Sequence, residues 1–154
     1  MRKSFLRISA VDTLRETMEI ILQGEERGSN TAAIAIINQD GNFAGLVTPN
    51  QVALGLLGDY ESNEASSDPG NFHSNLESRL SITVDAILSP DQPTVDPESS
   101  LATLAKLAGE SDFECIPALS KGRVEGLVYT TDIFKEVAAI ALNPEDQGIA
   151  LGED

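Results

Sequence analysis

Short apolar runs bounded by polar turn residues predict strands in the first half of the chain. Such runs cover residues 7–9, 32–37 and 43–47. Asp40 and Gly41 stand between the last two runs and form a dipeptide that is typical of a tight hairpin turn. The first half is therefore expected to contain a short strand followed later by a β-hairpin.

Apolar residues at helical spacing predict two helices in the same half. The first helix starts near Thr13 and Glu16, which have the spacing of a capping box. Pro49 fits the first turn of the second helix. The apolar residues expected to face the core are Leu14, Met18, Ile21 and Leu22 in the first helix and Val52, Leu54, Leu56 and Leu57 in the second.

The second half has a similar order of elements. Residues 82–88 form a short amphipathic piece, and residues 101–108 carry apolar side chains at helical spacing. Strands are expected over residues 116–119 and 124–128, and a helix over residues 130–142, which stops before a proline. In this last helix the apolar pattern consists of Ile133, Phe134, Val137, Ala138 and Ala141.

Composition changes between these two halves and again at the end of the chain. Residues 59–78 are rich in acidic residues, serine and asparagine, which favours a flexible acidic linker. Residues 144–154 form an acidic tail. The expected organisation is a first repeat over 1–58, the linker over 59–78, a second repeat over 79–143, and the tail.

Charge and hydropathy exclude several classes of protein. A formal net charge of −15 over 154 residues argues against binding to nucleic acid or to an anionic membrane surface. No apolar run approaches the ~20 residues of a membrane helix, so a cytoplasmic location is expected. Cys115, the single cysteine, lies in an apolar strand and has no histidine partner, which favours an inert buried thiol.

The two halves repeat one another. Residues 8–14 align with residues 95–101, and Gly45-Leu46-Val47 aligns with Gly126-Leu127-Val128. Each half is expected to contain a strand, a helix, two strands and a helix over roughly fifty residues, a length typical of units that bury their cores together.

This duplicated order resembles the tandem cystathionine β-synthase (CBS) domain pair, or Bateman module. The resemblance is carried by Val95-Asp96-Pro97 with Leu101, by Cys115-Ile116-Pro117, and by the glycine motif leading to Asp132. It implies an α+β (α/β) fold of two pseudo-symmetric repeats, each a three-stranded sheet with two helices, packed sheet to sheet. It also implies homodimers built through the helices, regulation of an unknown partner protein, and no catalysis.

The resemblance also implies a ligand site, because the glycine motif of the family usually ends in Thr or Ser, two variable residues and Asp. A carboxylate accepts both hydrogen bonds of a ribose cis-diol, and hydroxyl groups with helix N-terminal N–H groups suit a phosphate. The second copy keeps the acid, which is Asp132. The first copy keeps the hydroxyl, Thr48, but has Gln51 where the acid would stand. The candidate ligand-binding residues are Thr48, Thr94, Ile116, Pro117, Tyr129, Thr130, Thr131 and Asp132.

The expected ligand is an adenine nucleoside or nucleotide in the cleft between the repeats. AMP is favoured over ATP because so acidic a chain offers few bases to a polyphosphate, although Arg79, Lys121 and Arg123 could oppose a phosphate. S-adenosylmethionine, another adenosyl ligand, also suits an acidic site, and no cofactor is required. In a purely structural alternative, Thr130 or Thr131 is only an N-cap and Asp132 only a favourable first-turn acid.

Two other functions compete with nucleotide binding. One is a homodimerisation scaffold with a degenerate, ligand-free cleft. The other is a sensor of Mg²⁺ or Ca²⁺, based on the acidic residues Asp59, Glu61, Glu64, Asp68, Glu110, Asp112 and Glu114. An enzyme is not expected, because the chain lacks a paired histidine and nucleophile, a phosphate-binding Gly-rich loop and a metal ligand set, so neither a catalytic residue nor a dedicated metal site is assigned.

Overall fold

The computed structural model describes residues 1–58 and 69–143, which form parts of two compact units. The first unit comprises Ser4–Gln92, and the second comprises Met1–Lys3 together with the chain from Pro93 onward. This division differs from the expected repeats 1–58 and 79–143, because residues 79–92 join the first unit and residues 1–3 join the second. The expected tail, residues 144–154, and residues 59–68 of the expected linker lie outside the described residues.

The first unit contains a three-stranded sheet in the order β1-β2-β3. Strand β1 (Arg7–Ser9) pairs in parallel with β2 (Ile34–Ile37), which pairs antiparallel with β3 (Phe43–Val47). The hairpin turns at Gly41, whose φ of 89° explains why glycine stands there. The strand and hairpin predicted from the sequence are therefore confirmed.

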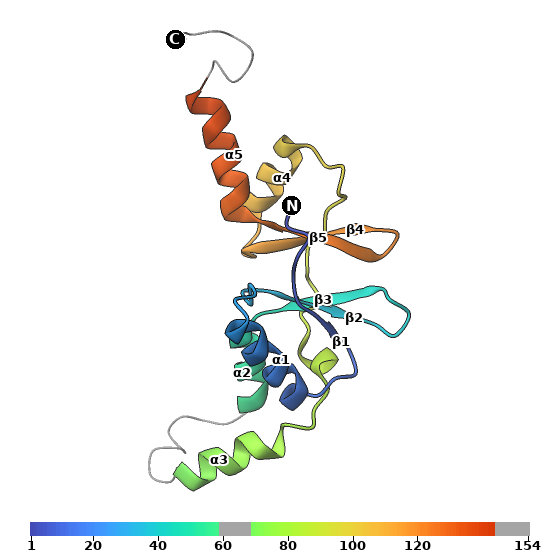
Figure 1. Cartoon of the computed structure of the whole chain (residues 1–154), viewed down its shortest axis with the longest axis vertical. Coiled ribbons are helices and arrows are strands. Elements are labelled where there is room, and N and C mark those ends of the chain that lie inside the picture. The colour runs from blue at the N-terminus through green and yellow to red at the C-terminus, as the bar shows by residue number, and fades with distance from the viewer. Residues whose placement is uncertain (59–68, 144–154) are drawn as a thin grey trace. The chain divides into compact units, whose positions relative to one another are not determined.

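Helices α1 (Leu14–Glu26) and α2 (Pro49–Leu57) pack beside each other against this sheet (Figure 1). The Thr13–Glu16 capping box is present. The buried core includes Ile8, Leu14, Ile21, Ile34, Ile36, Val47, Val52 and Leu56. Leu22 and Leu54, which were expected to face the core, are 58% and 64% exposed. In α1 the buried face includes Thr17, whose hydroxyl donates to the carbonyl of Thr13 at 2.8 Å.

Residues from the expected linker and second repeat complete the first unit. Helix α3 (Pro69–Ser78) lies within the predicted linker, so that part of the segment is helical. The 3₁₀ helix η2 (Val84–Ile87) follows. Its Val84 is fully buried, and backbone bonds of 2.8 Å run from Leu14 N–H to the carbonyl of Ile82 and from Val84 N–H to that of Asp12. These contacts explain why the segment belongs to the first unit.

The second unit repeats the plan with a smaller sheet. Strands β4 (Cys115–Ser120) and β5 (Arg123–Tyr129) pair antiparallel, and helices α4 (Leu101–Glu110) and α5 (Thr130–Leu142) contact each other. The expected third strand is reduced to a single parallel bridge between Val95 and Ala118. On the other edge, Arg2 forms an antiparallel bridge with Leu127. The described residues thus form a mixed α+β fold in two repeats.

Most of the apolar residues of α5 do not face the core. Ile133 is buried, whereas Phe134 is 71% exposed and Val137 is 40% exposed. Ala141 is exposed as well. The helical periodicity predicted the helix correctly, but the apolar stripe that it indicated is mainly an outer face of α5.

Candidate functional site

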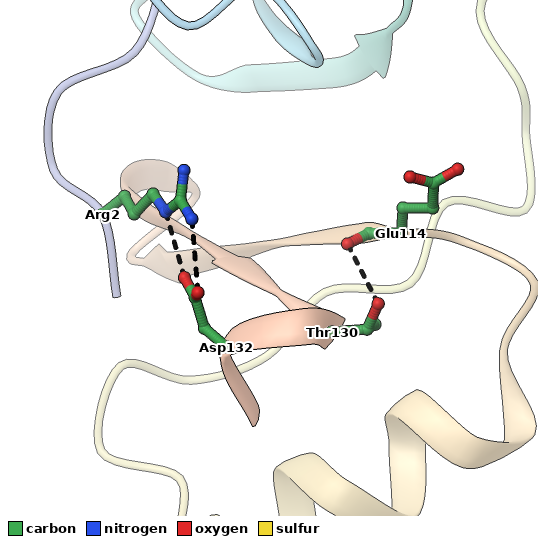
Figure 2. Close-up of polar contacts among 4 residues, drawn as sticks. All are labelled: Arg2, Glu114, Thr130 and Asp132. Atoms are coloured by element: carbon green, nitrogen blue, oxygen red, sulfur yellow. Dashed lines mark hydrogen bonds and ion pairs between the residues drawn. The ribbon is translucent and has the colours of Figure 1, made fainter. Parts of the chain in front are cut away.

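The candidate site lies where β5 ends and α5 begins. Tyr129 is the N-cap of α5, and its side chain makes no capping hydrogen bond. The N–H of Thr130 donates to the carbonyl oxygen of Glu114 at 3.0 Å. Its hydroxyl donates to the same oxygen at 3.3 Å (Figure 2). Neither Thr130 nor Thr131 is therefore the N-cap that the structural alternative proposed. Asp132 stands in the first turn of α5, as expected.

The carboxylate of Asp132 is held by Arg2. The Nε atom of Arg2 donates to Oδ2 at 3.0 Å, and Nη2 donates to Oδ1 at 3.2 Å (Figure 2). The guanidinium also lies 4.3 Å from the centroid of the Tyr129 ring, within the range of a cation–π contact. The two side chains remain partly open to solvent, with 46% of Arg2 and 34% of Asp132 exposed.

The backbone of the first residues positions Arg2. Arg2 and Leu127 exchange two backbone hydrogen bonds of 2.8 Å, so Arg2 forms an isolated antiparallel bridge to β5. The absence of a side chain at Gly126 allows this approach, because a Cβ there would lie 3.0 Å from the carbonyl oxygen of Arg2 and would meet Met1. Gly45 is covered in the same way by Leu88. Gly126 of the second repeat is thus covered by residues that precede the first repeat, and Gly45 of the first repeat is covered by Leu88, which precedes the strands of the second.

The ion pair shifts the acid–base properties of both partners. The hydrogen bonds from Arg2 lower the pKa of Asp132, and the bond to Asp132 raises the pKa of Arg2. Nearby, burial raises the pKa of Cys115 to about 12, although a hydrogen bond from Tyr129 opposes this change. Asp132 is therefore an ionised acceptor near neutral pH, whereas Cys115 is a buried thiol with little thiolate.

The first copy of the motif is closed by its own side chains. The hydroxyl of Thr48 accepts from the N–H of Gln51 at 3.2 Å, and the Gln51 side chain accepts from the N–H of Thr48 at 2.9 Å. Pro49 follows at the start of α2. The capping box thus engages the side chains of both Thr48 and Gln51 in hydrogen bonds to the backbone at the start of α2.

The other predicted site residues differ in exposure. Thr94 is exposed, whereas Ile116 and Pro117 are fully buried. Ile116 packs into the helix-facing core of the second unit. Pro117 is tolerated in β4 because its partner Leu127 directs its own backbone groups to Arg2 and needs no N–H from proline. Both side chains are therefore closed to solvent.

Of the cations considered for a phosphate, Arg79 has another partner. Its Nε donates to the carbonyl of Gly55 at 2.8 Å, near the C-terminal end of α2. Lys121 and Arg123 are exposed at the β4–β5 turn. The sequence reasoning missed Arg2, which contacts the candidate carboxylate directly. No local pattern marks it, because its partner is 130 positions away.

The described part of the chain holds neither a cluster of metal-ligating side chains nor a helix that could span a membrane. Within residues 1–58 and 69–143, no group of three or more His, Cys, Asp or Glu side chains could hold a metal ion. Glu110, Asp112 and Glu114 therefore do not form such a group. Asp59, Glu61, Glu64 and Asp68 lie outside the described residues. None of the helices described is both long and apolar enough to cross a membrane.

Comparison with known sequences identifies one repeat and a distant relative. Residues 84–139 match the family model of the CBS domain. The chain is also similar to an uncharacterized protein, MJ1404, of Methanocaldococcus jannaschii, with 25% identity over 112 residues. This match covers 73% of the chain but only 26% of the relative, so the chain spans about a quarter of that protein.

Solved structures with similar folds extend over both units. A CBS domain-containing protein from Kribbella flavida matches with a TM-score of 0.71 and 13% identity, covering 90% of this chain and 94% of that one. The CBS-domain containing protein ATU1752 from Agrobacterium tumefaciens matches with a TM-score of 0.60 and 13% identity, covering 88% of this chain and 90% of that one. The cytosolic domain of the Mg²⁺ channel MgtE, solved in complex with ATP, matches with a TM-score of 0.64 and 16% identity. The match covers 87% of this chain and 45% of that one. The chain therefore contains a CBS domain over residues 84–139 and folds as a CBS domain pair.

Proposed function

We propose that this CBS domain pair is a regulatory module that binds an adenine nucleoside or nucleotide, with AMP favoured, and transmits the change to a partner protein. The observation that carries the proposal is the place of Asp132, an ionised carboxylate in the first turn of α5. The ATP complex of the similar MgtE domain supports the same ligand class.

The chemistry of the β5–α5 junction suits a ribose with a single phosphate. The two oxygens of Asp132 accept hydrogen bonds from a cis-diol, and the N-terminus of α5 favours negative charge. Arg2, Lys135 and the amino group of Met1 are the cationic groups whose charges act on Asp132. With a net charge of −15 on the whole chain, so few cationic groups favour a monophosphate over a triphosphate.

Titration calorimetry with AMP, ADP, ATP and S-adenosylmethionine tests the proposal. The wild-type protein is expected to bind AMP most tightly, and Asp132→Ala is expected to weaken binding about tenfold or more, in line with the loss of a charged hydrogen-bond acceptor. Asp112→Ala is the matched control, because it removes an exposed carboxylate from the same unit. The absence of heat with all four ligands would overturn the proposal.

Homodimerisation is part of the same proposal. The outer face of α5 presents Phe134, Val137, Ile140 and Leu142, all at least 40% exposed. Contiguous apolar residues on a helix favour burial against another protein surface. We propose that the dimer contact lies on this face. We also propose that the protein is located in the cytosol, as the MgtE domain is.

A ligand-free dimerisation scaffold is the second candidate. It is favoured by the existing bond between Arg2 and Asp132, which satisfies the carboxylate without a ligand. The scaffold predicts that no small molecule accompanies the protein through purification. Mass spectrometry of molecules released from the fresh protein separates the two functions, because a co-purifying adenine nucleotide contradicts the scaffold.

A further inference from the structure

We propose that Arg2 is a built-in competitor of the ligand, so that binding of a nucleoside at Asp132 requires the guanidinium to leave the carboxylate. This inference rests on the proposed function and deepens it. It makes residues 1–3 an autoinhibitory segment of the second unit.

The competition follows from the geometry of the two hydrogen bonds. Arg2 uses both carboxylate oxygens, with Nε at 3.0 Å from Oδ2 and Nη2 at 3.2 Å from Oδ1. A ribose cis-diol bound in a bidentate manner needs the same two oxygens. Each oxygen has a further lone pair, but a diol that donates one hydroxyl to each oxygen approaches from the side of the carboxylate where the guanidinium fork already lies. The two bidentate arrangements therefore exclude each other, and the ligand must replace a charge-assisted pair before it forms its own.

The replacement can occur without detaching the segment from the sheet. The backbone of Arg2 is bonded on both sides to Leu127, whereas its side chain is 46% exposed. Exposed ion pairs are weak and exchange readily with solvent. A change of the Arg2 rotamer is therefore sufficient to open the carboxylate, and the strand edge keeps the guanidinium near enough to close it again.

The contact with Tyr129 couples the competitor to the rest of the site. Arg2 lies over the ring at 4.3 Å, so it covers one face of the aromatic residue that precedes α5. A base that stacks on this face has to displace the same guanidinium. Removal of Arg2 thus frees the carboxylate and uncovers the ring face beneath the guanidinium, on a residue that is 9% exposed with Arg2 in place.

Calorimetry with adenosine tests the competition, because adenosine has no phosphate with which Arg2 could pair. Arg2→Ala is expected to bind adenosine about two- to fivefold more tightly than the wild type, the range given by the strength of an exposed ion pair. Arg2→Lys, which keeps the charge but loses the bidentate fork, is expected to lie between them. Arg7→Ala is the matched control, because Arg7 lies 4.1 Å over the Phe5 ring in the first unit and its loss changes the net charge equally.

The outcomes distinguish the competitor from the site itself. Tighter binding of adenosine by Arg2→Ala, with Arg7→Ala unchanged, supports the competitor. Equal or weaker binding by Arg2→Ala than by the wild type overturns the competitor and leaves the nucleotide site in place. If neither protein binds adenosine or AMP, the proposed function fails and the competitor fails with it.

Discussion

Arg2 and Asp132 are 130 positions apart in the sequence, yet the guanidinium of the first donates two hydrogen bonds to the carboxylate of the second. The pair joins Arg2, which is bridged to β5 through Leu127, to the first turn of α5. It is the contact from which the acid–base behaviour of the candidate site follows.

The pKa of Asp132 should respond directly to the loss of Arg2. In Arg2→Ala the pKa of Asp132 is expected to rise towards the ordinary value of 3.8, because the hydrogen bonds that lower it are gone. Carbon-13 NMR of the carboxyl group during a pH titration measures the change. An unaltered pKa in the variant would contradict the ion pair.

The same pair makes stability depend on pH in a defined direction. Because the pKa of Asp132 is lowered in the folded protein, the pair stabilises the fold at pH values above 3.8. That contribution is lost as the pH falls through the lowered value. The difference in stability between wild type and Arg2→Ala should therefore shrink on acidification, with urea unfolding at several pH values as the measurement.

The capping box of α2 should contribute measurably to stability. Thr48→Ala is expected to lower the free energy of unfolding by about 1 kcal/mol, because the N–H of Gln51 loses its acceptor. Thr131→Ala is the control at the equivalent helix, where Tyr129 is the N-cap, and it should change stability by less than about 0.5 kcal/mol. Urea denaturation that ranks the two variants in the opposite order would refute the capping role.

Gly126 should be essential for the docking of residues 1–3. An alanine there would crowd Met1 and the carbonyl of Arg2, so Gly126→Ala is expected to cost about 1–3 kcal/mol and to speed hydrogen exchange at the N–H of Leu127. Gly109 in α4 has no atom within 4 Å of its Cβ position, and Gly109→Ala should stabilise the helix by about 0.5–1 kcal/mol. Protected exchange at Leu127 in the Gly126 variant would contradict the docking.

The outer face of α5 should determine the oligomeric state. Phe134→Glu is expected to convert the proposed dimer into a monomer, because it places a charge on an apolar contact, while stability changes little at a residue that is 71% exposed. Leu22→Glu is the control, since Leu22 is an exposed apolar residue of α1. Sedimentation velocity measures both. If Phe134→Glu sediments like the wild type, the dimer contact does not lie on the outer face of α5.

Local signals in the sequence predicted the elements well. The strand over Phe43–Val47 and the helix over Thr130–Leu142 were both recognised from short-range periodicity and flanking turn residues. The capping box at Thr13 was recognised from spacing alone. Periodicity did not decide which apolar side chains are buried, since Leu22 and Phe134 fit the pattern and are exposed.

Contacts between distant segments could not be predicted in this way. The position of Asp132 at the start of α5 follows from local spacing, but its bond to Arg2 depends on how the first residues pair with β5. The unit boundaries have the same origin, because the segment around Val84 bonds to residues near Asp12. Such pairings depend on tertiary packing that the local pattern does not contain.

The most direct measurement of the central claim is a two-dimensional ¹H–¹⁵N NMR titration of the protein with AMP. If Asp132 and the N-terminus of α5 form the ligand site, the backbone amide signals of Tyr129–Ile133 and Arg2 shift together and saturate, and Asp132→Ala removes the response. An unchanged spectrum, or shifts that leave the β5–α5 junction unaffected, would contradict the account.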